Sequence, residues 1–185
     1  MNKIKSLSEI ESLFEKWGQS FYSEKVSQTA HGVQCAQLAI EDGAPSSLVV
    51  AALLHDIGHL ADLEDLNGVE EHSIDTSHEA TAARLLASIF PPSVTAPIAM
   101  HVDAKRWLCA REVGYFESLS EASVASLALQ GGPMTDSEAD RFIAMPHAKD
   151  AIRLRRWDDF GKETDRDLVP FEDFQRLLTT HSAQL

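Results

Sequence analysis

The feature that most constrains the fold is an apolar run that ends abruptly in groups able to bind a metal or move protons. The run extends from Leu48 to Leu54 and is followed at once by His55 and Asp56, and then by His59. Burying a histidine beside an aspartate is unfavourable unless both side chains are paired. A metal cation at the end of a helix would pair them. The sequence therefore predicts a metal site here, with further ligands from other parts of the chain.

The rest of the chain reads as helical nearly throughout, because apolar residues recur with helical spacing and the segments end at glycine or proline. Predicted helices cover about residues 8–17, 27–42, 77–90, 93–110, 120–130, 136–145, 148–158 and 171–182. One more helix opens at Pro45 and carries the His55-Asp56 pair, and an acidic loop over residues 62–75 follows it. Strand patterns are nearly absent. We therefore predict an all-α fold.

Composition and charge narrow the class of protein. The 185 residues suffice for one domain with a sizeable core. No apolar run approaches the roughly 20 residues of a membrane span, and the N-terminus lacks the apolar stretch of a secretory signal. The net charge of -13 argues against a general nucleic-acid binder but permits a small anionic substrate. Cys35 and Cys109 have no CxxC spacing, which indicates a reducing cytoplasm. We expect a cytoplasmic protein with no membrane or nucleic-acid partner.

Four of the eight histidines fall at similar intervals, each on a different predicted helix: His31, His55, His78 and His101. A helical bundle could aim all four at one point. Asp56 could bridge two cations with its two oxygens, and Asp158 is a plausible last ligand. Four imidazoles and two carboxylates without a thiolate suit iron, manganese or other borderline divalent ions better than a structural zinc site. A single helical histidine is more often a packed or surface residue, so the prediction rests on the set.

The order of these ligands resembles the HD-domain superfamily, in its six-ligand, two-metal branch. The simplest members are metal-dependent phosphohydrolases with fewer ligands. Along most of its length the chain further resembles the HD-domain mixed-valent di-iron oxygenases that cleave organophosphonates, of the PhnZ/TmpB type. The matching pieces are Ala51–His59, His101–Arg106, Gln130–Met134 and Arg155–Asp158. The resemblance implies a single HD domain over residues 1–185, built as a helical bundle around a di-metal site.

The resemblance also implies roles for individual residues. The first iron would be held by His31, His55, Asp56 and Asp158, and the second by His78, His101 and the bridging Asp56. Substrate would be contacted by His59, Lys105, Ser123 and Arg155, chiefly at its phosphonate. The residue types agree with this role, because Lys and Arg donate to a tetrahedral dianion. Solvated helix surface is the alternative reading for Lys105 and Arg155, and helix packing or capping for Ser123.

The segment Phe21-Tyr22-Ser23-Glu24 departs from the family pattern. There, a tyrosine three residues before a glutamate occupies the second iron until substrate displaces it, and the glutamate contacts the substrate amine. Here Phe21 stands at the tyrosine position. Tyr22 is therefore the candidate gating residue and transient iron ligand, and Glu24 the candidate contact to the amine. The acidic loop could surround an ammonium group or be a solvated loop.

The implied activity is oxygen-dependent cleavage of the C–P bond of a 1-hydroxy-2-aminoethylphosphonate, with the amine free or N-trimethylated. The products would be phosphate and glycine or glycine betaine. The implied cofactors are two iron ions in a mixed-valent Fe(II)/Fe(III) state, with dioxygen as co-substrate, and an upstream hydroxylase would supply the substrate. The alternative is a metal-dependent phosphohydrolase of a nucleotide or phosphate ester, which needs no dioxygen. A ligand-sensing HD module is the third reading.

Overall fold

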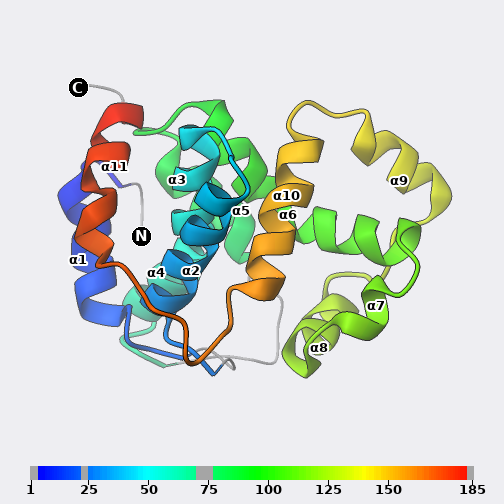
Figure 1. The fold of residues 1–185 in the computed structure, drawn as a ribbon, viewed down its shortest axis with the longest axis horizontal. Coiled ribbons are helices and arrows are strands. Elements are labelled where there is room, and N and C mark those ends of the chain that lie inside the picture. The colour runs from blue at the N-terminus through cyan, green and yellow to red at the C-terminus, as the bar shows by residue number, and fades with distance from the viewer. Residues whose placement is uncertain (1–3, 22–24, 70–76, 183–185) are drawn as a thin grey trace.

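The computed structural model describes residues 4–21, 25–69 and 77–182, and every regular element in these ranges is a helix (Figure 1). In chain order the elements are α1 (Leu7–Trp17), α2 (Gln28–Glu41), α3 (Ser46–Leu54), α4 (Ile57–Asp65), α5 (His78–Leu86), α6 (Pro92–Arg111), α7 (Tyr115–Ser118), α8 (Glu121–Leu129), α9 (Asp136–Ile143), α10 (Ala148–Phe160), the 3-10 helix η1 (Phe171–Phe174) and α11 (Gln175–His181). The prediction of an all-α fold is confirmed.

The helices form two groups that meet at α6 and α10. In Figure 1, α1 to α4 and α11 lie to the left of α10, and α7 to α9 lie to the right. The main hydrophobic core joins residues from α1 to α6, α10 and α11. A smaller core joins α6, α9 and α10. Because α10 also packs on α2 and α3, it connects the two groups at the centre of the molecule.

Helix α3 is the centre of the main core. Every residue from Leu48 to Leu54 is buried, and α2, α6, α10 and α11 pack around this helix. Burial of each large aliphatic side chain contributes about 1.5–3 kcal/mol, so a helix that is apolar on all sides is stable only in such a position. By length and composition the stretch Ser46–Asp65 could also cross a membrane, but 78% of its most apolar window is buried inside the protein. That burial is typical of a core helix.

The segment that carries the His-Asp pair departs from the prediction. Helix α3 ends at Leu54, His55 is its C-terminal cap, and Asp56 forms a turn before α4. The prediction that one helix carries the pair was therefore wrong. The prediction of a loop from residue 62 was wrong for residues 62–65, because the buried face of α4 extends to Leu63 and the helix ends at Asp65. The turn places His55 and Asp56 beyond the last apolar residue of α3, Leu54.

Two glycines allow the helices around this turn to approach closely. A Cβ atom at Gly32 of α2 would lie 2.6 Å from the carbonyl oxygen of Leu53 in α3. A Cβ atom at Gly58 of α4 would lie 2.1 Å from the carbonyl oxygen of His78, at the start of α5. Any side chain would therefore push these backbones apart. The two crossings bring the residues beside the glycines, including His31 and His78, towards the same place.

Candidate metal centre

The structure brings all six candidate ligands together from different elements. They are His31 in α2, His55 at the end of α3, Asp56 in the turn, His78 at the start of α5, His101 in α6 and Asp158 in α10. The six residues form two groups that share one carboxylate.

The first group is formed by His31, His55 and Asp158. The Nε2 atoms of His31 and His55 lie 3.3 Å apart. The Oδ1 atom of Asp158 lies 3.4 Å from Nε2 of His31 and 4.0 Å from Nε2 of His55. Asp56 approaches the same two atoms, with Oδ2 3.5 Å from His31 and Oδ1 3.4 Å from His55. These donors surround one point and could hold one cation.

The second group is formed by His78, His101 and Asp56. The Nε2 atoms of the two histidines lie 3.2 Å apart. The Oδ1 atom of Asp56 lies 3.5 Å from Nε2 of His78 and 3.8 Å from Nε2 of His101. Asp56 therefore lies between the two groups, where one carboxylate could bridge two cations.

The rings are oriented by backbone carbonyl groups on their other side. The Nδ1 atom of His31 donates to the carbonyl oxygen of Gly161 at 2.8 Å. Likewise Nδ1 of His55 donates to Ala52 at 2.9 Å, and Nδ1 of His101 donates to the carbonyl oxygen of Ile98 at 2.8 Å. With the proton on Nδ1, each Nε2 atom presents a lone pair to the centre, and this is the usual arrangement of metal-binding histidines.

The positions of these donors supply a physical test of whether the residues fit a metal. The Nε2 atoms of His31 and His55 lie 3.3 Å apart and 3.4–4.0 Å from carboxylate oxygens of Asp56 and Asp158. Burial lowers the pKa of His31, but Cys35 and Asp158 raise it well above its usual value, so the cluster favours a positive charge at its centre, which a metal cation would supply. The donor set of the first group therefore fits a metal ion.

The protonation states of the site also favour cation binding. Burial lowers the pKa of His101 to about 4 and lowers that of His78 well below its usual value. Burial alone would raise the pKa of Asp158, but the charges of Arg155 and Lys162 hold it well below its usual range. At neutral pH these imidazoles are therefore neutral and this carboxyl is ionised. Metal ligands need those forms.

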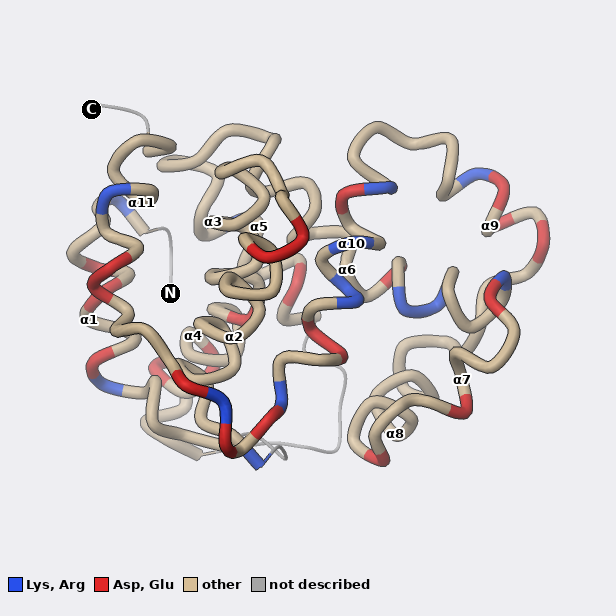
Figure 2. The backbone as a smooth tube through the Cα atoms, viewed as in Figure 1, with Lys and Arg blue, Asp and Glu red and all other residues tan. Residues whose placement is uncertain are grey.

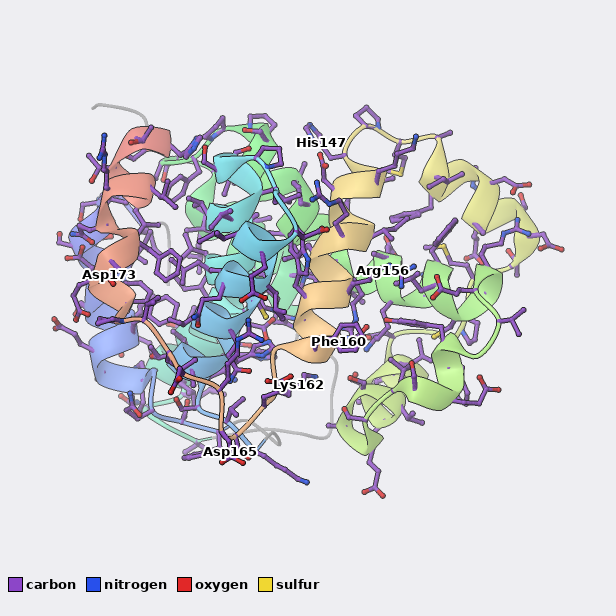
Figure 3. All side chains as sticks on the ribbon, in the orientation of Figure 1. His147, Arg156, Phe160, Lys162, Asp165 and Asp173 are labelled. Carbon is purple, nitrogen blue, oxygen red and sulfur yellow. The ribbon has the colours of Figure 1, made fainter. Side chains whose placement is uncertain are left out.

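Basic side chains adjoin the first group. Four Lys and Arg residues lie on α10 and three on α6, the two helices that meet at the centre (Figure 2). Lys162 follows the end of α10 (Figure 3), and its Nζ atom lies 3.8 Å from Oδ1 of Asp158. An anion could bind here despite the net charge of -13 of the whole chain.

The candidate substrate residues are buried next to the ligands. Lys105 is 2% exposed, and its Nζ atom donates to Oγ of Ser126 at 2.7 Å and to the carbonyl oxygen of Ser123 at 3.5 Å. Burial, with the nearby charge of Arg155, lowers the pKa of Lys105 to about 7. His59 is buried and its ring stacks on that of His78, with centroids 4.1 Å apart. Solvated helix surface is therefore excluded for Lys105.

Arg155 links the substrate residues to the ligands. It is 4% exposed, and its Nη1 atom forms an ion pair with Oδ2 of Asp158 at 2.7 Å. Its Nη2 atom donates to Oγ of Ser123 at 3.3 Å. A buried arginine between a carboxylate and a serine could bind a tetrahedral oxyanion. The two remaining candidates, Tyr22 and Glu24, lie outside the described residues.

Some residues near the centre were not predicted from the sequence, although Cys35 lies one helical turn after His31 in α2. Cys35 lies with its Sγ atom 3.9 Å from both ring nitrogens of His31. Its thiol donates to the carbonyl oxygen of Trp157 at 3.4 Å, and burial raises its pKa, so it is a thiol rather than the thiolate that metals bind. Tyr115 and Asp159 contact Arg155. The Asp158-Asp159 doublet is the one visible signal for the latter.

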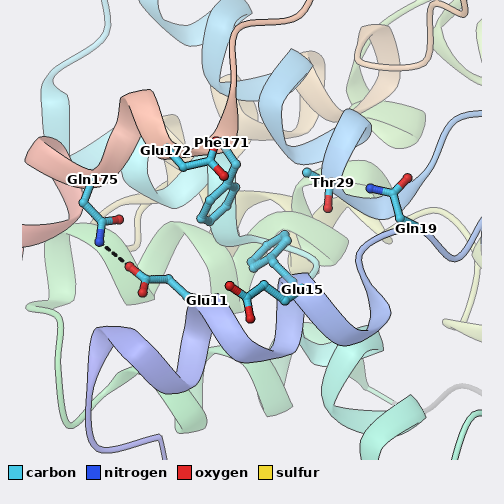
Figure 4. A pocket seen from close by; sticks show the side chains of 8 residues that line it. Glu11, Glu15, Gln19, Thr29, Phe171, Glu172 and Gln175 are labelled. Atoms are coloured by element: carbon cyan, nitrogen blue, oxygen red, sulfur yellow. Dashed lines mark hydrogen bonds between the residues drawn. The ribbon is translucent and has the colours of Figure 1, made fainter.

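A separate groove of about 310 Å³ lies between α1, the start of α2 and the η1–α11 segment (Figure 4). Phe14 and Phe171 pack there with ring centroids 4.6 Å apart and ring planes tilted by 34°, and Gln175 donates a hydrogen bond to Glu11 at the rim of the groove. None of the six candidate ligands lines this groove. It is therefore distinct from the metal centre.

Comparison with known proteins gives a family and three relatives. The HD-domain family profile matches residues 26–144. A hydroxymethylphosphonate dioxygenase of Gimesia maris is 46% identical over 152 residues, which are 81% of this chain and 75% of that protein. A glycine-betaine-forming 1-hydroxy-2-(trimethylamino)ethylphosphonate dioxygenase of Leisingera caerulea is 36% identical over 98% of this chain and 94% of its own length. An uncharacterized protein of Acanthamoeba polyphaga mimivirus is 30% identical over 98% of this chain and 84% of its own length.

Proposed function

The chain belongs to the HD-domain family, and we propose that it is an oxygenase that uses two metal ions and dioxygen to cleave the carbon–phosphorus bond of a small hydroxyphosphonate. Two relatives are named as phosphonate dioxygenases, and both names describe a substrate with a hydroxyl group on the carbon next to phosphorus. The observation that carries the proposal is the pair of His-Asp groups sharing Asp56, with the buried Lys105 and Arg155 beside them.

The reaction balances without a further reductant. A hydroxyphosphonate R–CH(OH)–PO₃²⁻ and one molecule of O₂ yield the carboxylate of R–COOH and inorganic phosphate. The C–P and C–H bonds break, the carbon is oxidised from the alcohol to the carboxylate level, and dioxygen takes up the four electrons. A phosphohydrolase would instead cleave a P–O bond with water and leave the carbon unchanged.

We assign one metal to His31, His55, Asp56 and Asp158, and the other to His78, His101 and the bridging Asp56. For both we propose iron in a mixed-valent Fe(II)/Fe(III) state, since a redox-active pair would supply the electron transfer to dioxygen. A set of four imidazoles and two carboxylates suits iron or manganese.

The remaining residues would bind and orient the substrate. Lys105 and Arg155 would donate to the phosphonate oxygens, and Ser123 would fix the direction of the Arg155 guanidinium. His59, stacked on His78, would approach the substrate from the second metal group. Such positioning of a reacting carbon contributes strongly to catalysis.

The substrates in the names of the two relatives differ in the substituent on the carbon next to phosphorus. Hydroxymethylphosphonate has no substituent there, and the other substrate has a trimethylaminomethyl group. We propose 1-hydroxy-2-aminoethylphosphonate, with a free or N-trimethylated amine, together with hydroxymethylphosphonate as the candidates. Glycine, glycine betaine and formate would be the respective carboxylates. Glu24 would contact an amine, and Tyr22 would occupy the second metal before substrate binds.

We further propose that the whole chain forms one HD domain in the cytoplasm. Residues 1–25 and 145–185 lie outside the matched part, yet residues of α1, α10 and α11 belong to the main core. Asp158, one of the ligands, also lies outside the matched part. A hydroxylase acting earlier would supply the 1-hydroxy substrate.

The test is phosphate release from each of the three hydroxyphosphonates by the iron-loaded protein, under air and under argon. We expect release under air with at least one substrate and none under argon. The variant Asp56→Asn should lose activity, whereas Asp150→Asn, on the exposed part of α10, should not. Phosphate release that is equal under argon, or hydrolysis of phosphate esters alone, would replace the proposal with the phosphohydrolase.

A further inference from the structure

The guanidinium of Arg155 is held on all three of its nitrogen atoms. Nη1 pairs with Asp158, and Nη2 donates to Ser123 and to Asp159. Nε donates to the hydroxyl of Tyr115 at 3.3 Å. Because a guanidinium is planar, contacts on these nitrogens fix its rotation as well as its position.

Two of these partners, Tyr115 and Asp159, have no role in the proposed function. Tyr115 begins α7, which packs on α6, and is 7% exposed. Its hydroxyl donates to Oδ2 of Asp159 while it accepts from Nε of Arg155. Asp159 in turn accepts from Arg155 through Oδ1. The three side chains therefore form a closed triangle of hydrogen bonds that joins α7 to α10.

The triangle determines which way Arg155 faces. Nε is bonded to Tyr115 and Nη2 to Asp159. In this orientation Nη1 lies 2.7 Å from Oδ2 of Asp158. The other oxygen of Asp158, Oδ1, then faces His31 at 3.4 Å. The contacts of Arg155 use four of the five N–H groups of its guanidinium, and the fifth, on Nη1 beside Asp158, could donate to an oxyanion.

We infer that Tyr115 and Asp159 are positioning residues, which hold the Arg155 guanidinium in the orientation that binds the phosphonate group of the substrate. The inference rests on the proposed function for the identity of the anion. Asp159 directly follows Asp158 in α10, but within the described part of the chain the side-chain hydrogen bonds of Tyr115 and Asp159 lead to each other and to Arg155, so both act through Arg155.

Asp159 could instead affect Arg155 only through its negative charge. This role and the positioning role predict opposite changes in anion affinity when the carboxylate is removed. As a mere counter-charge, Asp159 reduces the attraction of Arg155 for an anion, so its removal should tighten anion binding. As a positioning residue, it holds the guanidinium in place, so its removal should weaken anion binding. Tyr115→Phe changes no charge and removes only the hydroxyl.

The experiment is calorimetric titration of the iron-loaded protein with inorganic phosphate under argon, with the metal content of each sample measured. For Asp159→Asn we expect a dissociation constant about tenfold higher than that of the wild type, and for Tyr115→Phe about threefold higher, as expected for losing hydrogen bonds to a charged group. Asp150→Asn, which removes a more exposed carboxylate from the same helix, should leave the constant unchanged. Steady-state assays with the preferred hydroxyphosphonate should show the same rise in KM and a smaller change in kcat.

Equal or tighter phosphate binding by both Asp159→Asn and Tyr115→Phe would overturn the inference, as would a wild type that binds no phosphate. If Asp159→Asn does not fold, as judged by its thermal transition, the dissociation constant of the milder variant Tyr115→Phe for phosphate tests the inference alone. Failure of the proposed function looks different: the wild type and variants would differ in phosphate binding as expected, yet no protein would release phosphate from a hydroxyphosphonate under air.

Discussion

His31 donates from Nδ1 to the carbonyl oxygen of Gly161, 130 residues later in the chain, at 2.8 Å. This bond connects the residue just after α10 with the first group of candidate ligands and places a proton on Nδ1 of the ring. A side chain at position 161 has no room, because a Cβ atom there would lie 2.5 Å from Sγ of Cys35.

Gly161→Ala should therefore displace the carbonyl group of residue 161 and weaken its hydrogen bond with Nδ1 of His31. We expect a loss of about 1–3 kcal/mol of stability from overpacking and a weaker hold on the first metal ion. Metal content after dialysis and the thermal transition measure both effects. The double variant Cys35→Ala, Gly161→Ala should recover most of each loss, since the colliding sulfur is gone. A double variant as poor as the single one would contradict this explanation.

Gly58→Ala should be more damaging, because its Cβ atom would meet the backbone of His78 rather than a side chain. We expect a fall in stability of at least about 2 kcal/mol, with displacement of His78 from the second group. Thermal unfolding measures the change. Gly43→Ala is the control: nothing lies within 4 Å of a Cβ atom there, so only its φ of +64° opposes the substitution. Equal losses at the two positions would show that the close contact is unimportant.

Lys105 should make phosphonate binding depend on pH. Burial and the Arg155 charge lower its pKa to about 7, so the ammonium is present below pH 7 and is lost above it. We expect kcat/KM of the wild type to exceed that of Lys105→Met by roughly ten- to a hundredfold at pH 6, and the ratio to approach one near pH 8.5. The second ionisation of the substrate cancels in this ratio. A ratio that is constant with pH would contradict the role of the ammonium.

Removing a ligand should reduce metal binding without unfolding the protein. We expect His101→Ala to retain about one metal ion per chain instead of two, because its Nε2 atom belongs to the second group only. His181→Ala is the matched control, since that ring is not a candidate ligand and is hydrogen-bonded to Ser46 at 2.7 Å. Elemental analysis measures the metal, and low-temperature EPR should show the coupled mixed-valent signal only in the wild type and the control. Full metal content in His101→Ala would remove this residue from the ligand set.

Much of the fold could be predicted because helical periodicity and glycine or proline stops are local signals. The resemblance to phosphonate-cleaving HD oxygenases, read from short motifs, is confirmed by the named relatives. The break between α3 and α4 was missed because no glycine or proline stands at the turn. The turn depends on the backbone angles at Asp56, which the residue type does not indicate. The four-residue helix α7 was missed because it is too short to show a period.

The site likewise combines residues that could be predicted with residues that could not. The histidines and aspartates are candidate ligands by residue type, and the structure brings all six together. Tyr115 and Asp159 act through a contact between α7 and α10 that only the tertiary fold creates. Cys35 lies one helical turn after His31 in α2, so its place beside that ring follows from the sequence spacing, and only its hydrogen bond to Trp157 depends on the packing of α2 on α10. Spacing in the sequence carries no information on contacts between helices that are far apart in the chain, such as Tyr115–Asp159 and Cys35–Trp157.

The most direct test of the central claim is the ratio of dioxygen consumed to phosphate released. An oxygen electrode and a phosphate assay would follow the same sample of iron-loaded protein with hydroxymethylphosphonate and the two aminoethyl analogues. The balanced reaction predicts one molecule of dioxygen per phosphate, with the matching carboxylate as product. Phosphate release without oxygen consumption would contradict oxidative cleavage and identify a hydrolase.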